Sequence, residues 1–104
     1  MPVDERTLDR VRQLLAHRDD VEEKRMVGGR SFLRAGRLCC GVNRAGLLVR
    51  VGATGMPAAL AQPHVSQMTM GGEPLVAFAV VAPEGVADDA ELARWVRAGF
   101  VSTD

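Results

Sequence analysis

Hydrophobic residues recur at helical spacing in the first segment of the chain. Within residues 4–17 the positions between the apolar ones are charged or polar, with acids at the start and bases at the end. Such an order suits the two ends of a helix dipole. It predicts an amphipathic helix whose buried stripe carries Leu8, Val11, Leu14 and Leu15.

From residue 21 the pattern changes to short apolar runs separated by breaks that contain glycine. These runs predict three antiparallel strands, near residues 24–34, 37–43 and 47–52. We expect Gly28-Gly29 to form a bulge inside the first strand, and Gly36 and Gly46 to supply positive φ in the two following turns.

The second half of the chain predicts one helix, two strands and a last helix. Thr54 is the expected N-cap of the short helix, with Pro57 in its first turn and Pro63 at its end. The strands "VSQMTM" and "PLVAFAVVA" meet at Gly71-Gly72. Asp88 or Asp89 caps the last helix, which turns four side chains inward: Leu92, Trp95, Val96 and Phe100.

The predicted order is α-β-β-β-α-β-β-α in one domain, residues 1–104. We expect an α+β fold, a two-layer α/β sandwich with a mostly antiparallel sheet. A chain of 104 residues with 47% hydrophobic residues can form a core without a disulfide or a metal. No segment approaches the roughly 20 apolar residues of a membrane-spanning helix, and the charged start excludes a secretory signal. We therefore expect a cytoplasmic protein with reduced thiols.

Several segments resemble the N-terminal domain of the TfoX/Sxy family: "VEEKRMVGG", "RLCCGVNRAGLLVRVG", "ALAQPHV" and "PEGVADDAELARWV". Val27 stands where members usually have an aromatic residue. The competence regulators of the family carry a further C-terminal helical domain, and we expect a small free-standing member without it. The resemblance thus implies the two-layer fold but not the regulators' role in activating DNA-uptake genes, and it supplies no catalytic residues.

The adjacent Cys39 and Cys40 are the first candidate for chemistry. Side chains alternate along a strand, so we expect Cys40 in the core and Cys39 on the other face, the more exposed of the two. Arg37 and Arg50 would then lower the pKa of a reactive Cys39 thiol. The alternative, which we favour, is that both cysteines only pack.

Other chemical sites lack the residues that they need. Zinc requires four ligands, and Cys39-Cys40 has no intervening residues. A strand, rather than the helix of a phosphate-binding loop, follows Gly28-Gly29. Ser31 has no histidine and acid at the spacing of a known triad motif. We expect no enzyme activity, no catalytic residue, no metal and no cofactor.

Charge is distributed unevenly along a chain whose formal net charge is zero. No acidic residue lies between Glu23 and Glu73, a segment with seven basic residues. This segment predicts an arginine-rich sheet, and nucleic-acid binding is the alternative function that it indicates. The competing interpretation is that the arginines pair with acids of the helices or are solvated. The arginines concerned are Arg25, Arg30, Arg34, Arg37, Arg44 and Arg50.

The strand "LVAFAVVA" is apolar on both faces. Helices cover one face of a two-layer fold, so either a helix wraps further around the sheet or the other face, with Val76, Phe78 and Val80, meets a second copy of the chain. We favour the second copy. The sequence thus favours a non-enzymatic interaction or regulatory domain that contacts other proteins, including an unknown partner, and forms a homodimer. The candidate interaction surface comprises Arg30, Phe32, Arg34, Arg37, Cys39, Arg50, Val76, Phe78 and Val80.

Overall fold

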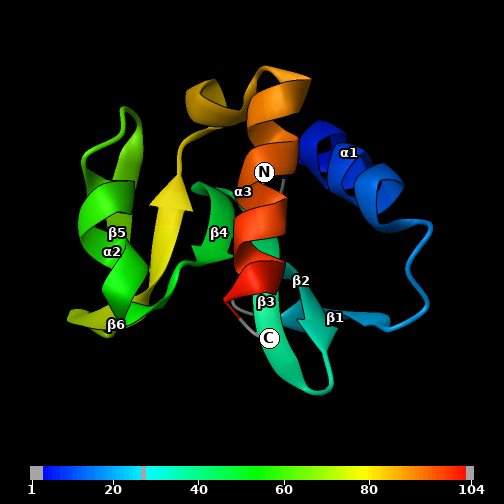
Figure 1. The fold of residues 1–104 in the computed structure, drawn as a ribbon, viewed down its shortest axis with the longest axis horizontal. Coiled ribbons are helices and arrows are strands. Elements are labelled where there is room, and N and C mark those ends of the chain that lie inside the picture. The colour runs from blue at the N-terminus through cyan, green and yellow to red at the C-terminus, as the bar shows by residue number, and fades with distance from the viewer. Residues whose placement is uncertain (1–3, 27, 103–104) are drawn as a thin grey trace.

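The computed structural model describes residues 4–26 and 28–102. Its helices are α1 (Glu5–Leu15), α2 (Gly52–Leu60) and α3 (Asp89–Val101), and a short 3-10 helix, η1 (Pro83–Val86), precedes α3. Its strands are β1 (Val21–Met26), β2 (Gly29–Arg34), β3 (Arg37–Asn43), β4 (Gly46–Arg50), β5 (Val65–Met70) and β6 (Glu73–Val81). The predicted α+β fold is confirmed (Figure 1).

The six strands form one antiparallel sheet in the order β1-β2-β3-β4-β6-β5. The predicted single strand over residues 24–34 is wrong, because Gly28 has a φ of 77° and the chain reverses there into a hairpin. Glycine tolerates this conformation, so Gly28 lies in a turn and not in a bulge, and Gly29 begins β2. Val27, which stands where members of the family usually have an aromatic residue, lies outside the described residues.

The three helices lie on the same face of the sheet (Figure 1). Side chains of α1, α2 and α3 share one hydrophobic cluster with buried residues of the central strands. The four side chains predicted to face inward from α3 are buried, as are Leu8, Val11 and Leu15 of α1. The sheet therefore has one face under the helices and one that no described helix covers.

The ends of the helices agree in part with those predicted from the sequence. Asp4 caps α1 by accepting hydrogen bonds from the amides of Arg6 and Thr7, and Asp88 caps α3. Thr54 is not the N-cap of α2, because this helix begins earlier, at Gly52. Pro57 consequently lies inside the helix, beyond its first turn. No described helix is long and apolar enough to cross a membrane.

Candidate functional site

The adjacent cysteines both lie in the core, as the favoured packing interpretation expects, although Cys39 was predicted on the other face of the strand as the more exposed of the two. Phe32 pairs with Cys40 but Leu33 pairs with Leu38, so the register between β2 and β3 shifts by one residue at Cys39. A bulge of this kind interrupts the alternation of side chains along a strand. Cys39 and Cys40 accordingly belong to the same hydrophobic cluster, and both are 0% exposed.

Burial makes these thiols poor nucleophiles. Desolvation, and in second place the neighbouring Cys39, raise the pKa of the Cys40 thiol. The sulfur of Cys39 lies 3.5 Å from the carbonyl oxygen of Arg37, as in a weak hydrogen bond. Among residues 4–26 and 28–102, no group of three or more His, Cys, Asp or Glu side chains is placed to hold a metal ion.

Gly99 lets α3 approach the cysteine pair closely. A Cβ atom added at Gly99 would overlap with the carbonyl oxygen of Cys39 and lie 3.7 Å from the Cβ atom of Cys40. The helix backbone therefore rests directly on the bulged part of β3. Sequence reasoning did not find this contact, because nothing local to α3 indicates what Gly99 packs against.

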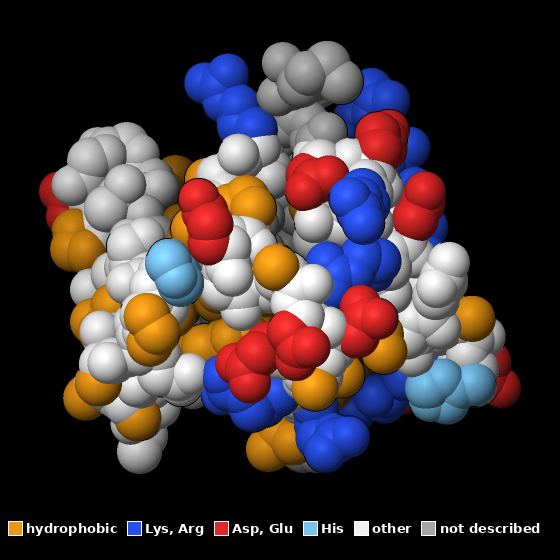
Figure 2. All heavy atoms as spheres, turned by 90° about the horizontal axis from the view of Figure 1, so that it is seen from above, with side chains coloured by type: hydrophobic (Ala, Val, Ile, Leu, Met, Phe, Trp, Pro, Cys, Tyr) orange, Lys and Arg blue, Asp and Glu red, His pale blue; other side chains and the backbone are white. Residues whose placement is uncertain are grey.

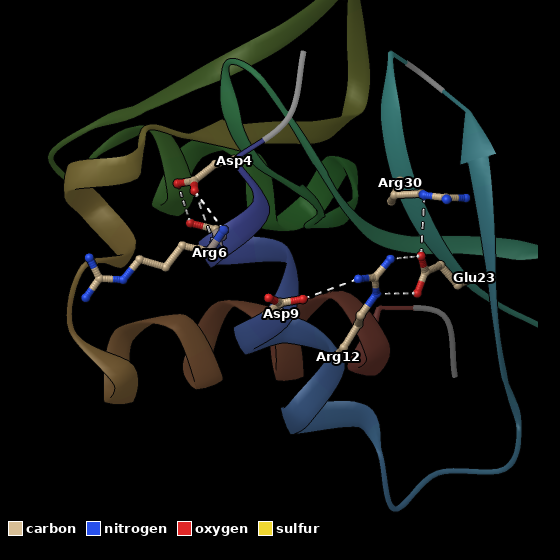
Figure 3. Close-up of polar contacts among 7 residues, drawn as sticks. Asp4, Arg6, Asp9, Arg12, Glu23 and Arg30 are labelled. Atoms are coloured by element: carbon tan, nitrogen blue, oxygen red, sulfur yellow. Dashed lines mark hydrogen bonds and ion pairs between the residues drawn. The ribbon is translucent and has the colours of Figure 1, made fainter. Parts of the chain in front are cut away.

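An ion-pair network connects α1 to the β1–β2 hairpin (Figure 3). The Arg12 guanidinium donates two hydrogen bonds to the Glu23 carboxylate, at 2.9 and 2.7 Å. Arg30 approaches the same carboxylate, at 3.6 Å, and Asp9 accepts from Arg12 at 3.3 Å. The hydrogen bonds from Arg12 hold the pKa of Glu23 below its usual value.

The arginines of the predicted surface differ in their contacts: some bind other groups of the protein and others are exposed. Arg30 is engaged by Glu23, and Arg34 donates to the carbonyl oxygen of Phe100 at 3.2 Å. Arg50 donates to the carbonyl oxygen of Leu38 at 2.6 Å. The exposed residues Arg25, Arg37 and Arg44 make no ion pair with another residue of the described ranges.

These arginines also lie on different sides of the sheet. Arg30 pairs with Val42, whose side chain is in the core under the helices. Arg50 pairs with Phe78, on the opposite face. The competing interpretation was that the arginines pair with acids of the helices. Arg30 does pair with an acid, Glu23, but Glu23 belongs to β1 and not to a helix. Nucleic-acid binding stays a prediction, and Arg30 and Arg50 could not both contact a ligand on one face of the sheet.

The face without helices carries the apolar residues predicted for it. Val80 pairs with Leu48, and Phe78 pairs with Arg50, whose guanidinium lies 4.7 Å from the centre of the phenylalanine ring. Phe78 and Val80 are half-buried, whereas Val76 is 65% exposed. This face is therefore the part of the predicted interaction surface that the structure brings together.

Phe32 and Cys39 do not contribute to that surface. Both are buried under the helices, with Phe32 only 3% exposed. Arg30 and Arg34 lie half-buried on β2, and Arg37 is exposed at the turn that follows. The sheet thus divides the predicted set between its two faces. Phe32 lies under the helices through the alternation of side chains along β2, and Cys39 lies there because of the bulge in β3.

Two grooves run beside α1. The larger, of about 810 Å³, lies between α1 and the start of α3, where Arg10 and Asp89 form an ion pair at 2.8 Å. The smaller, of about 380 Å³, lies between the ends of the same helices and is lined by Arg18 and Arg34 around Phe100. Sequence reasoning missed both grooves, since their walls come from opposite ends of the chain.

The architecture defines an α+β domain with one antiparallel sheet and all its described helices on one face. The TfoX N-terminal domain family matches residues 13–101 of the chain. The chain belongs to this family, which confirms the resemblance seen in its motifs. No curated protein and no solved structure matches it.

Proposed function

We propose that the chain is a non-enzymatic interaction and regulatory domain of the cytoplasm that acts through protein–protein contacts as a homodimer. The observation that carries this proposal is the exposure of Val76 beside the half-buried Phe78 and Val80, on a sheet face without a described helix. The burial of both thiols supports a role without covalent chemistry.

The helix-free face suits packing against a second copy. Two antiparallel sheets pack stably when apolar side chains of their facing surfaces interdigitate, and a two-fold dimer needs a surface that is complementary to itself. Val76 and Val80 carry no charge, and the Arg50 guanidinium lies over the ring of Phe78. A copy related by a two-fold axis would cover Val76, the most exposed of these three apolar residues.

The molar mass in solution tests this proposal. Light scattering across a range of concentrations is expected to give about twice the 11.2 kDa of one chain for the wild type. Val76→Asp is expected to give the monomer, because a dimer would bury an unpaired carboxylate. Val101→Asp is the matched control: Val101 is equally apolar and 61% exposed, but it ends α3, away from the sheet face.

Two results would count against the homodimer. One is a wild-type mass of a single chain at every concentration. The other is equal dissociation of Val76→Asp and Val101→Asp, which would show that the added charge acts without regard to the face that carries it.

A further inference from the structure

The outer edge of β5 presents backbone groups that no described strand pairs. β5 is the last strand in the sheet order, with β6 on its inner side. The amide of Ala82 donates to the carbonyl of His64 at 2.8 Å, which makes these two residues a hydrogen-bonded pair. Such pairs alternate along an antiparallel ladder, so the backbone groups of Val65 and Gln67 point away from β6.

The two edges of the sheet differ in their protection. β1, at the opposite edge, has the sequence VEEKRM, and four of its six residues are charged. Charged side chains on an edge strand discourage other strands from pairing with it. β5, with the sequence VSQMTM, has no charged residue and no proline. Only the β1 edge is protected in this way.

The surroundings of β5 are also free of fixed charge. Residues 51–72, which include α2 and β5, contain no Asp, Glu, Lys or Arg. Figure 2 shows charged side chains concentrated over α1 and the start of α3, and few charged ones, with scattered hydrophobic side chains, on the side of α2 and β5. Leu60 of α2 and Met70 of β5 are 41% and 54% exposed. Depletion of charge with an exposed Met is typical of the centre of a protein interface.

We propose that the β5 edge binds an extended, uncharged segment of a partner protein as an added seventh strand. Only a strand matches alternating N–H and C=O groups, and an uncharged one leaves no ionic group unpaired beside α2. The proposal rests on the interaction role of the domain but not on its dimer, because the edge would bind through backbone groups of β5, whereas the dimer would form through side chains of the helix-free face.

The shape of β5 favours a partner segment over a second copy at this edge. Its register with β6 is interrupted between Gln67 and Thr69, so its regular part is short. Two copies pairing through β5 would have to match two such interrupted strands along their length. A short flexible peptide pairs with the regular part alone, near Val65 and Gln67.

A displayed library of random 12-residue peptides, selected on the full chain, tests the proposal. We expect the selected peptides to share an uncharged run without proline, and to slow hydrogen exchange at the amides of Val65 and Gln67. The double variant Ser66→Lys, Thr69→Lys gives β5 the kind of charge that β1 has. It is expected to bind them at least about tenfold more weakly, whereas Thr54→Lys, in α2, binds them as the wild type does.

Three outcomes would overturn the proposal. They are the absence of any selected peptide, equal binding to the double variant, and protection of Val65 and Gln67 that rises with protein concentration alone. The last would identify a second copy as the occupant of the edge. The mass of the Val76→Asp variant is measured separately, so failure of the proposed homodimer and failure of the edge site give different results.

Discussion

Replacing Gly99 with alanine tests whether α3 rests on the bulged strand. The added Cβ atom would overlap with the carbonyl oxygen of Cys39 and lie 3.2 Å from its carbonyl carbon. Both are backbone atoms of a central strand, so they have no rotamer through which to move away. Either the helix shifts outward, or the bulge is distorted, and both reduce the packing of Trp95 and Phe100 on the sheet.

The size of the effect follows from two opposing contributions. Overpacking a core costs about 1–3 kcal/mol, and contact with fixed backbone favours the upper part of that range. Alanine in place of glycine within a helix contributes about 1 kcal/mol in the other direction. Gly99→Ala is therefore expected to lower the free energy of unfolding by about 1–2 kcal/mol, with a fall in Tm of about 5–10 °C for a domain of this size.

Urea unfolding followed by the fluorescence of Trp95, the only tryptophan, measures this change at one fixed protein concentration. Gly55→Ala is the matched control, because it makes the same substitution in α2, where the new Cβ atom meets only Val51, at 3.6 Å. The control is expected to be more stable than the wild type by up to about 1 kcal/mol. If Gly99→Ala is as stable as Gly55→Ala, the close approach of α3 is refuted.

Two further predictions concern the cysteines and the ion-pair network. Cys39 and Cys40 are expected to react with a thiol reagent only after urea unfolds the chain, because both are fully buried; rapid labelling of either in the native protein would contradict their placement. The pKa of Glu23 is lowered in the folded state by Arg12, so its contribution to stability is present at neutral pH and lost as pH falls through that pKa. Glu23→Gln is expected to lower the free energy of unfolding by less than about 1 kcal/mol at pH 7, and by a smaller amount in acid, with Glu22→Gln as the control. An equal decrease in the free energy of unfolding at both pH values would contradict the linkage.

Much of the fold was predictable because helices and turns depend on nearby residues. The apolar stripe of α3 and its Asp88 cap lie within a few positions of each other, and the glycines at Gly71-Gly72 mark the β5–β6 turn. The same local reading misjudged Gly28-Gly29. A bulge and a tight turn both use glycine, and only the pairing of Met26 with Gly29 distinguishes them.

The candidate surface was predicted less well. Alternation along β6 correctly assigned Val76, Phe78 and Val80 to the face away from the core. Alternation along β3 failed at Cys39, because the strand pairs out of regular register with β2 there. A register shift is decided by two strands together, so the residues of one strand do not reveal it.

The sequence by itself determined the α+β class, most elements and the family, since these follow from periodicity, capping and local motifs. The tertiary structure decided that both cysteines face the helices and that Arg12 reaches Glu23. It also decided that the two edge strands are β5, which has no charged residue, and β1, which has four. These features depend on which segments become neighbours, and that is set by the burial of the whole core rather than by any one segment.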